Sequence, residues 1–342
     1  MQGLKNILLK EHLLVFMFCI AVLTGPAVAT LFQYDLSRFP DCATYLGLAH
    51  FDFHQNLVRR YRVLIPFTAA AINFLFGRIF GHISPSYFTG NYSLSFSFLV
   101  INMVLTAYFG LLIYRYCRAF GASKLSSIIG ILVMLTCRYT IYMVAFPLVD
   151  SFFCVIVAWT LLGIKLKNTS MLVWAIFIGP FAKESFIFIA PLIFFFSHLG
   201  KGRMLLYFSI SAVLFFGFRY IYDIYTMGDM NMDFRTDLGL FSGIFPNLKK
   251  LFSIYTLFKI IMNTGWWVAA PVFVLLVNPA WDKQLLASLD KYLVYFIASV
   301  LLQMLLSGSM ERMFYLAMPV ICVIVALSTD ELTKLYIRVV ER

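Results

Sequence analysis

About ten runs of this sequence are long and apolar enough to be membrane-spanning helices, if roughly twenty residues are needed to cross a hydrocarbon core of about 30 Å. Only 13% of its 342 residues are charged and 62% are hydrophobic, whereas soluble domains are about one quarter charged. The sequence therefore predicts an all-α integral membrane protein, a polytopic bundle that forms a single transmembrane domain over residues 1–342. The predicted spans are 13–32, 93–115, 125–145, 149–165, 171–182, 184–199, 204–222, 258–277, 290–307 and 312–329.

The distribution of basic residues predicts how these spans are oriented. A further apolar run, 63–80, is accompanied by Pro66, Arg78 and His82, which suit a helix lying in the membrane surface better than one crossing it. If this run stays on the outer side, the basic residues of the later short loops all fall inside, as the positive-inside rule requires. We therefore expect interfacial helices in a first outer loop, 33–92, and a second outer loop at 223–257.

The same rule accounts for the net charge of +11. The Lys and Arg residues are scattered through short loops rather than gathered in one patch, so we expect contacts with membrane lipids and none with nucleic acid. None of the six cysteines has metal-ligand or CxxC spacing. Cys42 lies in the first outer loop without an evident partner cysteine, which argues against a redox role.

With this orientation, most ionisable residues of the apolar regions are predicted to lie at one level on the outer side. Charges at membrane depth are costly, so their clustering marks a candidate site. Asp41 has the strongest case for chemistry, because its loop is otherwise rich in apolar residues and directly follows the first span. The other candidates are Asp35, Tyr45, His54, Arg59, Arg62, Arg138, Asp150, Lys183, Glu184 and Arg312.

Several of these candidates also have purely structural interpretations. Asp150 could simply begin a helix at the membrane interface. Lys183 and Glu184 could form a structural ion pair between two short helices that meet near the outer face, where the charges stay close to water. Arg312 could anchor its helix in the interface, as long basic side chains often do.

The basic and histidine-containing parts of the first outer loop also have more than one interpretation. Arg59 and Arg62 belong to an Arg-Arg-Tyr-Arg sequence that could hold lipid headgroups without any catalytic part. His50 and His54, four residues apart, could be metal ligands on a helix, but no third ligand stands at a metal-binding spacing. We assign no metal site, and a divalent ion at Asp41 stays as an alternative.

Several short motifs follow one another along the chain. Asp-x-x-x-Tyr-Leu-x-Leu-Ala begins at Asp41 and is followed by Tyr-Arg-Val-Leu-Ile-Pro, which ends at Pro66. Later come Tyr-Arg-Tyr-Cys-Arg-Ala-Phe-Gly at 114–121, Ala-Lys-Glu-Ser at 182–185 and Arg-Met-Phe-Tyr-Leu-Ala-Met-Pro at 312–319. Taken in order, the motifs resemble four parts of GT-C membrane glycosyltransferases, especially of their polytopic bacterial relatives. These parts are the first outer loop, a cytoplasmic turn, the element between two short helices and a late helix.

The resemblance implies a helical bundle that transfers a sugar from a polyprenyl-phosphate donor to a glycan, lipid or protein acceptor. It implies that Asp41 is the general base and that Lys183, Glu184 and Arg312 lie near the donor phosphate or its pocket. It also favours a bacterial inner membrane, with the site facing the periplasm or the cell exterior. One departure is Cys42, which follows Asp41 where the family often has a second acidic residue.

The sequence therefore predicts an inverting glycosyltransferase in which Asp41 takes the proton of the acceptor hydroxyl. Arg312 would stabilise the departing phosphate, helped by Lys183 or by Arg59 and Arg62. Arg138 lies inside a predicted span and must find a partner or a phosphate. Asp150 would hold an acceptor hydroxyl or orient a basic residue. The site would be supported by Glu184, Tyr45, Asp35 and His54. Two alternatives remain, a transporter or lipid flippase, which would call for an internal repeat and charges at the midplane, and a non-catalytic subunit of a membrane complex.

Overall fold

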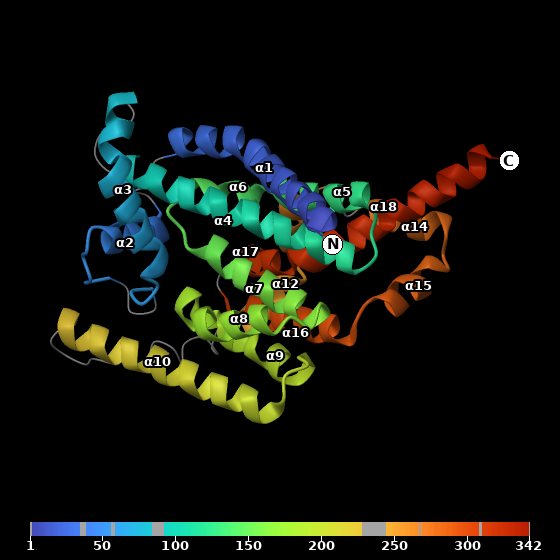
Figure 1. Ribbon diagram of the computed structural model, residues 1–342. Helices are drawn as coiled ribbons and strands as arrows, with labels where there is room; N and C mark the ends of the chain where they lie inside the picture. Colours follow the sequence, from blue (N-terminus) through green and yellow to red (C-terminus); the bar gives the residue numbers. More distant parts are fainter. Residues whose placement is uncertain are drawn as a thin grey trace.

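The computed structural model is helical throughout the residues that it describes, which are 2–34, 39–55, 59–83, 92–227, 244–265, 267, 269–307 and 310–341. Figure 1 shows α1 and α4 lying alongside each other, with α10 on the opposite side of the molecule. The helices are α1 Gln2–Gln33, α2 Pro40–Ala49, α3 Leu64–Ile83, α4 Tyr92–Ala119, α5 Lys124–Leu135, α6 Arg138–Ala145, α7 Asp150–Lys165, α8 Thr169–Ala182, η2 Glu184–Phe188, α9 Ala190–Phe196, α10 Lys201–Met227, α12 Ile244–Leu251, α13 Ile254–Thr264, α14 Ala269–Val277, α15 Trp281–Ser288, α16 Lys291–Leu306, α17 Met310–Phe314, η4 Tyr315–Ala317 and α18 Met318–Val340.

The core is organised around α4 and α7. Helix α4 packs against α1, α3, α5 and α7, while α7 packs against α8 and is buried along nearly its whole length. Helix α18 lies against α5, where a Cβ atom at Gly130 would come within 2.8 Å of the backbone oxygen of Cys322. A side chain at position 130 would therefore force α5 and α18 apart.

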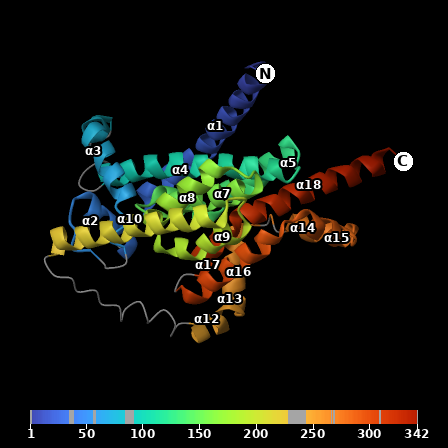
Figure 2. The same cartoon turned by 60° about the horizontal axis from the view of Figure 1, so that its bottom comes forward.

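The two ends of the bundle differ in character. At one end, Glu11 of α1 accepts a hydrogen bond from Tyr114 of α4 and pairs with Lys124 of α5 at 2.5 Å. Asp330 of α18 accepts hydrogen bonds from the start of α5, and Lys165 at the end of α7 pairs with Asp290. The other end carries α2 and α3, which lie at the left of Figure 2, opposite α5. Lys124 and Lys165, two of the basic residues in the later loops, therefore lie at the first of these ends.

The prediction of about ten spans is wrong. Among the described residues, four helices are long and apolar enough to cross a membrane: Leu9–Gln33, Tyr92–Ala119, Lys201–Thr226 and Met310–Val340. The number rises to six if the bent pairs α5–α6 and α15–α16 each count as one span. Several predicted spans are interrupted or short: α7 has 16 residues and α8 has 14, and the run at 258–277 is divided between α13 and α14.

A physical reason explains the overcount. A helix that is apolar all round can owe its composition either to lipid or to burial within the protein. Helix α7 is the clearest example of the second case, because 13 of its 16 residues are buried among neighbouring helices, Phe153 and Leu161 among them. Predicting spans from apolar length alone therefore included helices that are buried within the protein.

Other helices present their apolar side chains outward. Only 11% of the most apolar stretch of α10 is buried inside the protein, and Val213, Phe216 and Ile221 are exposed along the helix. The N-terminal half of α1 likewise exposes Leu13 and Leu14. Contiguous apolar surface of this extent is not stable in water, so these faces suit contact with lipid. Together with the four long apolar helices, this surface fits a multi-pass membrane protein.

The described part of the expected first outer loop contains two helices. Helix α2 follows α1, and α3 stands across the end of α4 in Figure 1. The run that we expected to be interfacial, 63–80, lies almost wholly in α3, which stands crosswise to α4. In the second expected outer loop, α10 extends to Met227 and α12 occupies Ile244–Leu251.

Candidate active site

Asp41 lies in the first turn of α2, where the helix dipole favours a negative charge. Pro40 precedes it at the start of the helix, a position that suits proline because no backbone donor is needed there. Both carboxylate oxygens of Asp41 are engaged by guanidinium groups: Oδ1 is 2.7 Å from Arg59 and Oδ2 is 2.5 Å from Arg312. Two residues far apart in the chain thus meet at this carboxylate.

Arg312 connects Asp41 to a second, deeper carboxylate. One of its terminal nitrogens bonds Asp41 and the other donates to Asp150, which begins α7. Asp150 also accepts a hydrogen bond of 2.9 Å from the Lys183 ammonium and a longer one from Tyr139. The result is a continuous chain of alternating charge, Arg59–Asp41–Arg312–Asp150–Lys183, that joins α2, α7, α17 and the break after α8.

The inner half of this chain is nearly sealed from solvent. Asp150 is 4% exposed and Lys183 is 5% exposed. Burial lowers the pKa of the Lys183 ammonium, while the Asp150 carboxylate opposes that effect. The Nε of Arg312 is buried and has no hydrogen-bond partner among the described residues. The guanidinium therefore keeps one donor that an added acceptor could use.

The position of Asp150 is fixed from α4. The Asn102 side chain donates hydrogen bonds of 3.1 Å to the backbone oxygens of Phe146 and Leu148 and accepts one from Ser151. A single buried amide thus holds the segment between α6 and α7 and the residue after Asp150. The start of α7 is placed by the core rather than by its own charges.

A second branch runs beside the first. Arg62 donates to the Glu184 carboxylate at 2.6 Å and to the Tyr45 hydroxyl at 2.8 Å. Tyr45 is fully buried in α2, and burial raises its pKa, so the phenol is neutral and can accept from Arg62. Lys183 and Glu184 stand where the chain breaks between α8 and η2, as the sequence predicted, and each residue bonds a different branch.

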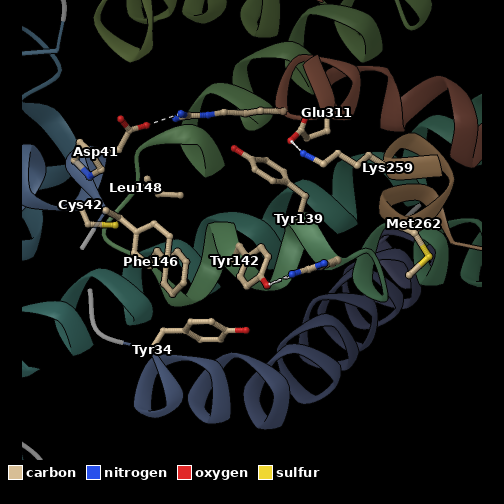
Figure 3. Close-up of a pocket in the computed structure, with 14 residues that line it drawn as sticks. Tyr34, Asp41, Cys42, Tyr139, Tyr142, Phe146, Leu148, Lys259, Met262 and Glu311 are labelled. Carbon is tan, nitrogen blue, oxygen red and sulfur yellow. Dashed lines mark hydrogen bonds and ion pairs between the residues drawn. The ribbon is translucent and has the colours of Figure 1, made fainter. Parts of the chain in front are cut away.

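A cavity of about 580 Å³ opens beside Asp41. Its size lies within the range of small-molecule sites, about 300–1,000 Å³. Figure 3 shows Asp41 and Cys42 on one side, Lys259, Glu311 and Met262 on the other, and Tyr139 and Tyr142 between them. The lining residues are Tyr34, Phe39, Pro40, Asp41, Cys42, Arg138, Tyr139, Tyr142, Phe146, Leu148, Lys259, Met262, Glu311 and Arg312.

Arg138 reaches this cavity because the predicted span at 125–145 is bent. Helices α5 and α6 meet at an angle of 65° around Cys137, so Arg138 begins a new helix instead of lying in the middle of a long one. Its guanidinium donates two hydrogen bonds, of 2.9 and 2.7 Å, to the Tyr142 hydroxyl. The expected partner of this arginine is therefore a tyrosine at the cavity wall.

One described candidate, His54, is not part of this arrangement. His54 is exposed, its backbone nitrogen donates to Asp52, and its side chain does not line the cavity. Asp35 lies outside the described residues. Among the residues that the structure describes, no three His, Cys, Asp or Glu side chains gather as a metal-binding group. At Asp41, the nearest charged groups are the guanidiniums of Arg59 and Arg312.

The sequence interpretation missed Lys259 on the far wall of the cavity and the two tyrosines between its walls. Lys259 of α13 pairs with Glu311 at 3.3 Å, and Tyr139 and Tyr142 come from α6. A signal for Lys259 was present, since it is the only charged residue in the otherwise largely apolar stretch of α13. Tyr139 and Tyr142 could not have been chosen by sequence from among the 19 tyrosines.

Cys42 is placed as an inert thiol. It is 1% exposed, and burial together with the neighbouring Asp41 raises its pKa to about 12. At pH 8 only about one molecule in ten thousand would carry the reactive thiolate. We expect native protein to react with N-ethylmaleimide at Cys42 at least about a hundredfold more slowly than denatured protein, as followed by peptide mass spectrometry. Labelling at equal rates in both states would contradict this placement.

Comparison with protein-family models, with curated proteins and with solved structures finds no match to this chain.

Proposed function

We propose that this protein is a membrane glycosyltransferase that moves a sugar from a polyprenyl-phosphate donor to an acceptor hydroxyl, with Asp41 as the general base. The observation that carries the proposal is the arrangement of charge around the cavity. Asp41 lies on one side, while Lys259, which pairs with Glu311, lies on the other, with Arg138 and Arg312 also in the lining. An inverting transfer needs a base and a phosphate-binding group on opposite sides of the reacting carbon.

The transfer balances as a single displacement. The acceptor oxygen forms a bond to the anomeric carbon and gives its proton to a carboxylate oxygen of Asp41. The bond from that carbon to the donor phosphate breaks, and the electron pair leaves with the polyprenyl phosphate. Each Asp41 oxygen already accepts one guanidinium hydrogen bond, but a carboxylate has about four acceptor sites in all, so capacity remains for the acceptor hydroxyl.

The departing phosphate gains negative charge, which cationic donors can stabilise. We assign this role to Lys259, which lies across the cavity from Asp41, together with Arg138 in the lining; Arg312 is bonded to Asp41 and lies on the side of the base. Lys183, Arg59 and Arg62 do not line the cavity, and they pair with Asp150, Asp41 and Glu184 respectively. These three residues therefore support the position of Arg312, Asp41 and α2 in our proposal.

The aromatic lining suits a sugar ring. Tyr34 and Tyr142 lie edge to face with ring centroids 6.0 Å apart, and Phe146 stacks on Tyr142. Sugar C–H faces pack favourably on such rings, while the tyrosine hydroxyls can bond sugar hydroxyls. We place the site at the outer surface of a bacterial inner membrane, with a glycan, lipid or protein as the acceptor.

The proposal is tested by removing the gene from its host and restoring the native chain. We expect the deletion strain to lack one defined sugar mass in a surface glycan, and the corresponding polyprenyl-phosphate sugar to accumulate, both measured by mass spectrometry. Restoration should reverse both changes. Unchanged glycan masses together with an unchanged pool of lipid-linked sugars would contradict the proposal, and retention of a complete saccharide on the inner side would instead support a transporter.

The phosphate-binding role of Lys259 makes a separate prediction. Lys259→Ala should lower kcat/KM about tenfold, because a charge-assisted hydrogen bond to the leaving phosphate is lost at a partly exposed position. Rates would be measured in membranes of the deletion strain carrying each variant, with the donor sugar identified as above. Lys249→Ala in the neighbouring α12, where the side chain is exposed outside the cavity, should stay within about twofold of the native rate. Equal effects of the two changes would rule out the role of Lys259.

A further inference from the structure

A second group of charged residues lies outside the cavity, where α10 meets the segment before α3. Arg60 pairs with Asp223 of α10 at 2.9 Å, and the Tyr61 hydroxyl donates to the same carboxylate. All three side chains are buried. The Asp223 carboxylate therefore already bonds both Arg60 and Tyr61.

Arg219 lies one turn before Asp223 on α10 and adds a second guanidinium. Its guanidinium contacts ring faces, with its centre 4.0 Å from the centroid of Tyr61 and 5.6 Å from that of Phe215. Its Nε is buried without a hydrogen-bond partner among the described residues, and so is the hydroxyl of Tyr222. Two neighbouring donors on one helix thus have no acceptor in the part of the chain that the structure describes.

The location limits what can supply that acceptor. Arg219 lies about two turns before the end of α10, the most exposed of the candidate spans. Phe216, Tyr220 and Ile221 are exposed around it and form an apolar face suited to acyl chains. An arginine at this depth is stabilised when its long side chain reaches the phosphates of the lipid headgroups. Guanidinium and hydroxyl donors together match phosphate oxygens.

We propose that Arg219 and Tyr222 bind the phosphate of an anionic phospholipid whose chains lie along the exposed face of α10. The local charge favours an anionic headgroup over a zwitterionic one, because no carboxylate among the described residues pairs with Arg219, whose guanidinium contacts ring faces instead. This lipid site is separate from the cavity beside Asp41 and does not depend on the proposed transfer reaction.

The test is a titration of the purified full chain with dioleoyl phosphatidylglycerol and, separately, dioleoyl phosphatidylcholine, followed by native mass spectrometry. The native chain should bind its first phosphatidylglycerol about tenfold more tightly than phosphatidylcholine. Arg219→Gln should reduce this preference to within about twofold. Arg203→Gln, which removes an exposed arginine at the other end of the same helix, should leave it unchanged.

Two milder variants make the test independent of how well Arg219→Gln folds. Arg219→Lys and Tyr222→Phe should each weaken phosphatidylglycerol binding about threefold, because each keeps the bulk of the side chain and removes only hydrogen-bond donors. The proposal would be overturned by unchanged binding in both of these variants, or by an equal loss in Arg203→Gln. Displacement of the lipid by millimolar inorganic phosphate would also overturn it, since the site would then take a free anion.

Discussion

Replacing Asp150 with Ala should destabilise the protein by about 3–5 kcal/mol, which is the cost of breaking a buried ion pair by removing one partner. Asp150 and Lys183 are almost completely enclosed, and Asp150 also receives a donor from Arg312. Without the carboxylate, the Lys183 ammonium would be buried with no counter-charge among the described residues, and Arg312 would lose one of its two ion pairs. Thermal unfolding of the purified variant in detergent, followed by circular dichroism, measures the loss.

Helix α7 offers a matched control at its opposite end. Asp290 pairs with Lys165 at the end of α7, but the Asp290 side chain is 40% exposed, so Asp290→Ala should cost at most about 1 kcal/mol. The double variant Asp150→Leu with Lys183→Met should recover most of the stability, because it replaces the buried charges with apolar side chains of similar size. If Asp150→Ala and Asp290→Ala unfold at the same temperature, the buried charge chain does not stabilise the fold.

The charge cluster was the part of the site that the sequence could predict. Ionisable residues are so unfavourable in an apolar bundle that each must find a partner, and a consistent orientation leaves one level at which they can meet. The structure joins Asp41, Arg59, Asp150, Lys183 and Arg312 by ion pairs. Their catalytic roles stay predictions.

Other features depend on packing that apolar composition does not reveal. Helix α7 is apolar because it is enclosed by protein, and nothing in its own sequence distinguishes it from a lipid-facing span. The bend at Cys137 is equally hidden, yet it brings Arg138 and Tyr142 to the cavity. Lys259 gave a local signal, but only the tertiary fold shows that it faces Asp41 across a cavity.

Asp41→Asn should lower the rate of sugar transfer by about 10²–10⁴-fold, the usual contribution of a general base. The amide keeps the shape of the carboxylate and an oxygen that can accept one guanidinium hydrogen bond, but it cannot take a proton from the acceptor. Stability should fall less than in Asp150→Ala, since the Asp41 side chain is 21% exposed. Initial rates with the identified donor, measured in membranes at matched protein levels, test the expected loss.

The most direct measurement of the central claim compares Asp41→Asn with Asp52→Asn in the strain that lacks the gene. Asp52 belongs to the same loop but is exposed and does not line the cavity. Mass spectrometry of surface glycans and lipid-linked sugars should show that the Asp41→Asn strain matches the deletion, whereas the Asp52→Asn strain matches the native one. If the Asp41→Asn strain makes the native glycan at the native level, Asp41 is not the base and the proposed active site is wrong.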